Sequence, residues 1–139
     1  MLQFLFDTDH LTLFDHKHQA VLHRHLAQPT GAVGISAVTV QEYLRGRLAA
    51  IARHRRGSKH VQSFQRLVDS VLLLQHFPIV NYDQGADAAY QKLLAMRLRI
   101  GTQDMKIAAV ALVNGLTLLT RNRRDFSLVS GLTLDDWSV

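Results

Sequence analysis

Four acidic residues stand far apart in the chain, and each follows a short apolar run or lies near the start of a predicted helix. They are Asp7, Glu42, Asp104 and Asp125. If the apolar runs are parallel strands, their carboxyl ends meet at one edge of a sheet, where ligands bind in folds of this kind. Carboxylates crowded there would raise each other's pKa, and a divalent cation removes that cost. Oxygen ligands suit Mg²⁺ or Mn²⁺, which can activate water and stabilise a phosphoryl oxyanion.

Each acid also has a purely structural explanation. Either Asp7 or Asp9 could N-cap the helix that follows the first apolar run. Glu42 occupies the glutamate position of a capping box that opens at a threonine three residues earlier. Asp104 stands in the first turn of a helix, where the helix dipole favours an acid. Asp125 follows a run of arginines and could be a solvated loop acid paired with one of them. The joint pattern is therefore more informative than any single member.

The elements that would position these acids alternate between short apolar runs and amphipathic segments. Strands are predicted at residues 2–6, 32–36, 79–80, 116–120 and 132–134. Helices are predicted from the first strand to about residue 26, then at 39–53, 59–76, 85–99 and 102–114. The last of these is apolar on all sides and should be buried. Alternating strands and helices predict an α/β fold with a parallel sheet and right-handed crossovers.

Composition sets the class of protein and of partner. The 139 residues predict one domain, 47% of them are hydrophobic, and the absence of cysteine excludes disulfides and thiolate metal sites. The net charge of +5 favours a polyanion such as nucleic acid, although an acidic protein partner would satisfy it too. The N-terminal apolar run is too short for a signal peptide or a membrane span, so we expect a cytoplasmic protein.

Histidine is concentrated in one stretch of the chain. His16, His18, His23 and His25 fall within ten residues, and His18 and His25 are one heptad apart. No spacing typical of a histidine metal site is present. We interpret the stretch as a solvated basic helix.

Five segments, taken in order, carry a family resemblance. They are Phe-Leu-Phe-Asp-Thr-Asp at 4–9, Ile-Ser-Ala-Val-Thr-Val-Gln-Glu-Tyr-Leu-Arg-Gly at 35–46, Ile-Gly-Thr-Gln-Asp-Met-Lys-Ile-Ala-Ala at 100–109, Leu-Thr-Arg-Asn-Arg-Arg-Asp-Phe at 119–126 and Gly-Leu-Thr-Leu-Asp-Asp-Trp at 131–137. The chain resembles the PIN-domain ribonucleases, and more closely the VapC toxins of bacterial type II toxin–antitoxin pairs. The resemblance spans nearly the whole length. It implies one PIN domain over residues 1–139, a three-layer fold with a parallel sheet of four to five strands flanked by helices.

The resemblance also implies a metal-dependent endoribonuclease and assigns residues to it. The catalytic acids would be Asp7, Glu42, Asp104 and Asp125, with Asp7, Asp104 and Glu42 holding Mg²⁺ (or Mn²⁺) to activate the attacking water. The supporting polar residues would be Thr8, Asp9, Thr120 and Asn122. Asp9 departs from the family, which often has Asn there, so its role as a ligand, a supporting acceptor or a cap stays open.

The partners implied by the resemblance are an RNA substrate, a second copy of the chain in a homodimer, and a VapB-like antitoxin that inserts a peptide across the active site. Arginines near the acids, such as Arg45, Arg47, Arg121 and Arg124, would neutralise phosphates of the RNA. No membrane is involved. Nothing in the chain is typical of a DNA-reading helix, so DNA would be bound only through the antitoxin.

Two other functions compete with this interpretation. The segment Asp7-Thr8-Asp9 mimics the opening of haloacid-dehalogenase-type phosphatases, with Asp7 as nucleophile and the pair at 135–136 as late acids. His10 stands where that motif expects glycine, and Glu42 would have no role. The second alternative is a non-catalytic RNA-binding PIN module, which should have lost acids that this chain retains.

Overall fold

A computed structural model describes all residues from 1 to 139 and contains one sheet of five parallel strands in the order β3-β2-β1-β4-β5. The strands are β1 (Phe4–Phe6), β2 (Val33–Ser36), β3 (Ile79–Val80), β4 (Thr117–Leu119) and β5 (Leu134–Asp135). The helices are α1 (Thr8–Asp15), α2 (Gln19–Leu26), α3 (Ala37–Arg53), α4 (Gly57–Gln75), α5 (Gln84–Ala95), α6 (Thr102–Asn114) and α7 (Arg123–Phe126). The predicted α/β class and parallel sheet are confirmed.

The central strand β1 is the point at which the sheet changes direction. It pairs with β2 on one side, where Leu5 faces Gly34, and with β4 on the other, where Leu5 faces Leu118. The chain first builds outward through β2 and β3, then returns to add β4 and β5 on the opposite side. Such a switch point leaves a crevice beyond the carboxyl end of the central strand.

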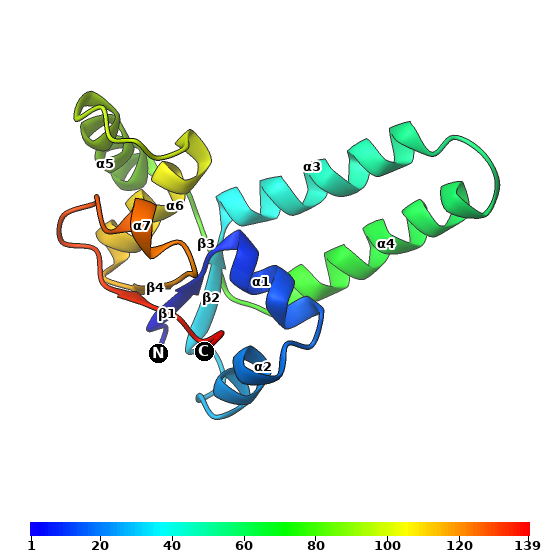
Figure 1. Ribbon diagram of the computed structural model, residues 1–139, viewed down its shortest axis with the longest axis horizontal. Helices are drawn as coiled ribbons and strands as arrows, with labels where there is room; N and C mark the ends of the chain where they lie inside the picture. Colours follow the sequence, from blue (N-terminus) through cyan, green and yellow to red (C-terminus); the bar gives the residue numbers. More distant parts are fainter.

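Alternating residues of the central strands supply two separate cores. Leu5 and Leu118 pack with α5, α6 and α7 on one face, whereas Phe6 and Leu119 pack with α1, α2, α3 and α4 on the other. All four side chains are fully buried. Because successive side chains of a strand point to opposite faces, each face of the sheet carries apolar side chains and is covered by helices. The result is a three-layer arrangement, with the sheet between two groups of helices (Figure 1).

Helix α6 is buried as its sequence predicts. Residues 107–111 have no exposed surface, and α5 packs along it. It ends at Gly115, whose φ of +63° is the left-handed conformation that favours glycine at a helix C-terminus. None of the helices combines the length and apolarity that a membrane crossing requires.

Helices α3 and α4 form a long antiparallel hairpin that extends beyond the sheet (Figure 1). Outward-facing apolar side chains follow one side of α4 and are 40–68% exposed, namely Val61, Phe64, Val68, Val71 and Leu72. Here they are called the α4 apolar stripe. The prediction of an amphipathic helix at 59–76 is confirmed, but only part of its apolar surface packs against α3.

Three predicted boundaries were wrong. The helix expected to end near residue 26 is two helices, because Lys17 adopts a left-handed φ of +59°. The helix expected at 85–99 ends at Ala95, and Arg97 has a φ of +53°. The threonine–glutamate capping box does not form, because helix α3 starts earlier and Ser36 is its N-cap, accepting a hydrogen bond from Thr39 N at 3.1 Å.

A pair of glycine substitutions tests the packing of β2. A Cβ at Gly34 would lie 2.9 Å from the carbonyl oxygen of Pro78, which is backbone and cannot move aside, whereas Gly46 in α3 has nothing within 4 Å. We expect Gly34→Ala to lower the free energy of unfolding by about 1–3 kcal/mol. Gly46→Ala should raise it by about 0.5–1 kcal/mol through helix propensity. Urea unfolding of both variants measures the contrast, and equal effects would contradict it.

Candidate active site

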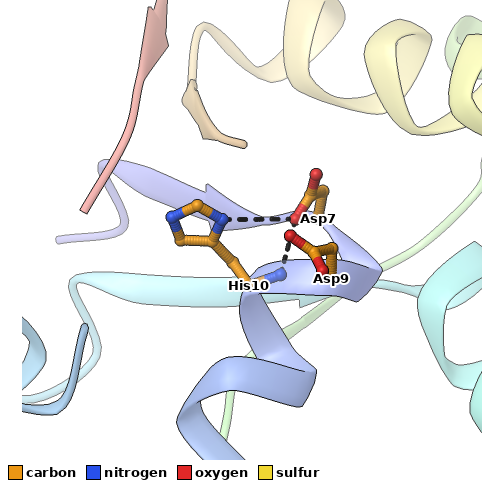
Figure 2. Close-up of side chains that lie close together, drawn as sticks. All are labelled: Asp7, Asp9 and His10. Carbon is orange, nitrogen blue, oxygen red and sulfur yellow. Dashed lines mark hydrogen bonds and ion pairs between the residues drawn. The ribbon is translucent and has the colours of Figure 1, made fainter. Parts of the chain in front are cut away.

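Asp7 directly follows β1 and has two roles at once. Its Oδ1 accepts a hydrogen bond from His10 N at 2.7 Å, which makes it the N-cap of α1. Its side chain is nearly buried, and Oδ2 has no hydrogen-bond partner in the protein. Figure 2 shows this second oxygen directed away from His10. The capping explanation is therefore correct for one oxygen, while the other remains available to a ligand.

Thr8 connects the end of β1 to the helix that follows β2. Its Oγ1 donates to Glu42 Oε1 at 2.6 Å and lies 3.0 Å from Thr39 Oγ1. Thr39 is fully buried, and its backbone is held by the cap residue Ser36. These contacts hold Glu42 beside the crevice and explain why Glu42 does not form the capping box.

Asp104 lies in the first turn of α6, across the crevice from these residues. The pKa of its carboxyl group is raised to about 6, chiefly by burial and then by the negative charges of Asp7, Glu42 and Asp125, in that order of effect. The N-cap of α6 is Gly101, so no side chain caps this helix. The structure thus brings all four predicted acids close enough to affect one carboxyl group.

Asp125 is positioned by the turn after β4. Thr120 is fully buried, and its Oγ1 accepts a hydrogen bond from Asn122 N at 2.9 Å. Asn122 then caps the short helix α7 by accepting from Asp125 N, and its Nδ2 donates to Asp125 Oδ2 at 3.0 Å. An arginine contact is present too, with Arg124 Nε 3.5 Å from Asp125 Oδ1. Thr120 and Asn122 therefore lie where supporting residues were expected, and the arginine pairing proposed as the alternative role of Asp125 is present as well.

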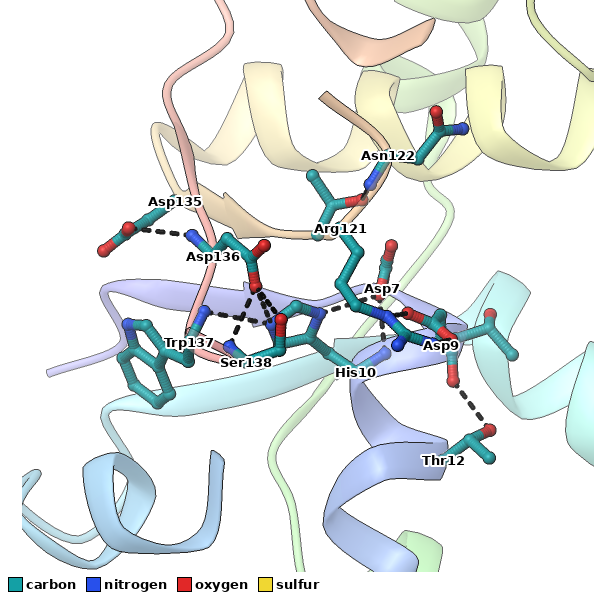
Figure 3. Close-up of polar contacts among 12 residues, drawn as sticks. Asp7, Asp9, His10, Thr12, Arg121, Asn122, Asp135, Asp136, Trp137 and Ser138 are labelled. Atoms are coloured by element: carbon teal, nitrogen blue, oxygen red, sulfur yellow. Dashed lines mark hydrogen bonds and ion pairs between the residues drawn. The ribbon is translucent and has the colours of Figure 1, made fainter. Parts of the chain in front are cut away.

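Asp9 pairs with Arg121 rather than capping α1. The guanidinium donates from Nε and from another nitrogen to the two carboxylate oxygens, each at 2.7 Å (Figure 3). Of the roles left open for Asp9, that of helix cap is excluded, because Asp7 holds that position. Both side chains are about half exposed, so the pair contributes about 0–1 kcal/mol to stability. Its main effect is to fix an arginine at the mouth of the crevice.

The crevice is a polar cleft of about 500 Å³. Its lining residues are Asp7, Thr8, Asp9, Asp104, Arg121, Asn122 and Phe126. Glu42 lines an adjoining pocket of about 280 Å³, which shares Thr8 with the cleft. The free oxygen of Asp7 and the raised pKa of Asp104 indicate that the carboxylates in the cleft have too few positive charges and hydrogen-bond donors around them. Carboxylate oxygens are also the ligands that Mg²⁺ and Mn²⁺ prefer. The donor set therefore fits such a cation.

Two residues near the cleft make contacts that were not predicted from the sequence. His10 is fully buried, with Nδ1 3.5 Å from Asp7 Oδ1, and forms with Asp7 and Asp9 a group whose potential ligand atoms lie within 4.8 Å of one another (Figure 2). Arg121 is the partner of Asp9. The position of His10, one helical turn after Asp7, was a signal that could have drawn attention to it.

The prediction of a solvated histidine helix was wrong in part. His16 and His23 are exposed, but His25 packs against Phe14 with ring centroids 4.8 Å apart and against Phe77 at 5.5 Å. Burial lowers the pKa of His25, and His76 lowers it further. His18 is the N-cap of α2.

Comparison with known proteins agrees with this geometry. Residues 5–132 match the PIN domain. The chain belongs to the PIN-domain family. The tRNA(fMet)-specific endonuclease VapC of Shigella flexneri is 28% identical over 143 residues, which cover 99% of this PIN domain and 100% of the relative.

Solved structures share the fold of this PIN domain. DNA-bound VapBC from Salmonella typhimurium has a TM-score of 0.77 at 23% identity and matches 99% of both chains. A toxin–antitoxin complex from Klebsiella pneumoniae has a TM-score of 0.69 at 23% identity, with 94% of this chain and 96% of that one covered. Membership of the PIN family contradicts the phosphatase alternative, in which Asp7 would be a nucleophile.

Asp104 should make the metal-free protein less stable as the pH rises. Its pKa is about 6 in the folded protein and 3.8 ordinarily, so the stability it contributes is complete below 3.8 and is lost as the pH rises through 6. In EDTA at about pH 7.5, the free energy of unfolding of Asp104→Asn should exceed that of the wild type by about 1–2 kcal/mol. This figure is reduced because the carboxyl group is partly exposed to solvent. The two should converge towards about pH 4. Urea unfolding at both pH values measures this, and a gap independent of pH would refute it.

Proposed function

We propose that this PIN domain, residues 1–139, is a VapC-type endoribonuclease, the toxin of a type II toxin–antitoxin pair, and that it requires Mg²⁺ or Mn²⁺. The observation that carries the proposal is the cluster of four acids at the end of β1, in which three carboxylates raise the pKa of the fourth. The full-length similarity to an endonuclease specific for transfer RNA supports RNA as the substrate. Because cellular RNA is in the cytoplasm, the protein is proposed to act there.

The acids divide the work according to how each is held. Asp7 presents a free Oδ2, and with Asp104 it would form the principal cation site, with Glu42 as a third ligand. When bound, the cation supplies the charge that lowers the pKa of water and stabilises developing charge on phosphoryl oxygens. Glu42 keeps one oxygen on Thr8, which leaves the other to orient the attacking water or accept its proton. Asp125, held by Asn122, is the second candidate for that task.

Arginines around the cleft would hold the RNA backbone. Arg121 lies at the mouth of the cleft, and Arg47 lines the adjoining pocket, with its Nε donating to Ser70 Oγ at 2.7 Å. A guanidinium fixed by a hydrogen bond loses less conformational freedom when it binds a phosphate. Binding through such contacts should weaken as salt rises.

Asp104→Asn tests catalysis against helix capping, with Asp87→Asn as the matched control. Both acids stand in the first turn of a helix, but only Asp104 is charge-coupled to other acids of the cleft. We expect Asp104→Asn to lower RNA cleavage in Mg²⁺ by at least about 1000-fold, comparable to losing a charge-stabilising group, and to remove the rise in melting temperature caused by Mn²⁺. Asp87→Asn should retain both.

The outcomes separate the alternatives. Cleavage that survives in Asp104→Asn would refute the role of the acid cluster. A wild type that folds and binds Mn²⁺ but leaves RNA intact would be a non-catalytic module. Hydrolysis of small phosphomonoesters in place of RNA would instead favour phosphatase chemistry.

The partner is proposed to be a VapB-like antitoxin, with a homodimer of the PIN domain within the complex and DNA bound through the antitoxin alone. Support comes from the solved complexes of similar fold. We assign the α4 apolar stripe to the anchoring contact with the antitoxin, because its exposed apolar side chains lie on the hairpin and do not line the cleft across which the antitoxin's peptide would insert.

A charge placed in the α4 apolar stripe should weaken the complex selectively. Phe64→Glu combined with Val68→Glu should reduce affinity for the cognate antitoxin by at least about 100-fold, the loss of two buried anchors. RNA cleavage should be unchanged. Gln62→Glu, a charge on another side of the same exposed helix, should have little effect. Titration calorimetry and gel filtration measure both, and loss of self-association with normal antitoxin binding would contradict this assignment.

A further inference from the structure

His10 lies directly behind Asp7 and is not used by the proposed mechanism. It is fully buried, and it is missing from the residues that line the cleft. Its Nδ1 faces Asp7 Oδ1 at 3.5 Å and has no hydrogen-bond partner. Its Nε2 accepts a hydrogen bond from Trp137 N at 3.2 Å. One imidazole thus connects the first acid of the site to the C-terminal end of the chain (Figure 3).

The C-terminal tail that contacts His10 is itself held in place. The Trp137 side chain is 3% exposed and packs against Phe4, with ring centroids 5.0 Å apart, and against Phe6. Asp136 Oδ1 accepts from Ser138 N at 2.8 Å and from Ser138 Oγ at 2.6 Å, and lies 3.6 Å from His10 Nε2. The backbone N–H of Trp137 is therefore a fixed donor aimed at the ring.

That donor determines where the imidazole carries its proton. A backbone N–H can donate only to a ring nitrogen with a free lone pair, so Nε2 is unprotonated and the neutral ring carries its proton on Nδ1. This proton faces Asp7 Oδ1. At 3.5 Å the contact is longer than a normal hydrogen bond and acts as an attraction between charge and dipole.

Asp7 Oδ1 consequently faces two N–H groups of the same residue, the backbone N–H of His10 at 2.7 Å and the ring Nδ1–H at 3.5 Å. A partial rotation of the carboxylate would move this oxygen away from both N–H groups and lose both interactions, whereas a half turn only exchanges two equivalent oxygens. We propose that His10 is a positioning residue, whose tautomer is set by the C-terminal tail and whose Nδ1–H fixes the Asp7 carboxylate so that Oδ2 is presented to the cation. The inference rests on the proposed function for the role of Asp7.

The first test needs neither metal nor activity. Nitrogen-15 NMR of the imidazoles in metal-free wild-type protein distinguishes a protonated ring nitrogen from an unprotonated one. The expected result for His10 is a protonated Nδ1 and an unprotonated Nε2. The opposite tautomer, or rapid exchange between the two, would overturn the proposal, since the tail would then not hold the ring.

The second test uses two amides that imitate different ring nitrogens. In His10→Asn the side-chain N–H occupies the place of Nδ1, whereas in His10→Gln it reaches the place of Nε2. Manganese affinity, measured by electron paramagnetic resonance, should fall roughly 10- to 100-fold in His10→Gln and within about threefold in His10→Asn. The melting temperature without metal should fall by a similar amount in both variants, because both remove the same buried ring.

The outcomes remain separable from those of the proposed function. Equal manganese affinities in the two variants would overturn the positioning role, even if both cleave RNA. Nitrogen hyperfine coupling to the bound Mn²⁺ in wild-type protein would overturn it too, because His10 would then be a direct ligand. A wild type that binds Mn²⁺ with the predicted contrast between variants but never cleaves RNA would refute the ribonuclease, and leave the role of His10 intact.

Discussion

Mutual repulsion among carboxylates is the constraint on which this structure depends. Burial, and after it the charges of Asp7, Glu42 and Asp125, raise the pKa of Asp104, so without a cation the folded state holds negative charge that the unfolded chain would disperse. Such a cost is tolerated only where the surrounding structure is over-determined. Here the two cores provide that support, with the fully buried run at 107–111 in α6 behind Asp104 and the fully buried Leu5 and Phe6 of β1 beneath Asp7. The charge is concentrated where the backbone is best anchored.

Hydroxyl groups and one imidazole hold the acids without neutralising them. Thr8 fixes one oxygen of Glu42, Thr120 fixes the turn that carries Asp125, and His10 faces one oxygen of Asp7. Neutral donors such as the Thr8 hydroxyl and the His10 ring stabilise a carboxylate while leaving its net charge for a cation. Arg121, the arginine that lines the cleft, is engaged instead by Asp9. An aspartate where the family often has asparagine therefore keeps this guanidinium at the mouth of the cleft and off the acids within it.

The sequence predicted elements and the identity of the acids better than it predicted their contacts. Burial of α6 and the parallel sheet followed from apolar runs, whose pattern depends on local period alone. The capping box failed because a serine three residues before Thr39 caps α3 first, which leaves Thr39 and Glu42 to contact Thr8. The contact between His10 and Trp137 joins residues 127 positions apart, and no local pattern encodes it. The breaks at Lys17 and Arg97 use a left-handed backbone that non-glycine residues seldom adopt.

Because Asp7 serves the fold and the site together, its substitutions carry two effects that must be separated. One oxygen caps α1, and replacing a cap by alanine costs about 0.5–2 kcal/mol. Loss of activity in Asp7→Ala would thus combine a weakened helix start with a lost ligand oxygen. Asparagine keeps an oxygen for the cap and removes the charge, so Asp7→Asn isolates the electrostatic part. His10 also has two roles. Its backbone N–H donates to the Asp7 oxygen that caps α1, and its ring helps to orient the same carboxylate. In this chain the start of α1 and the first acid of the cleft are one structural unit.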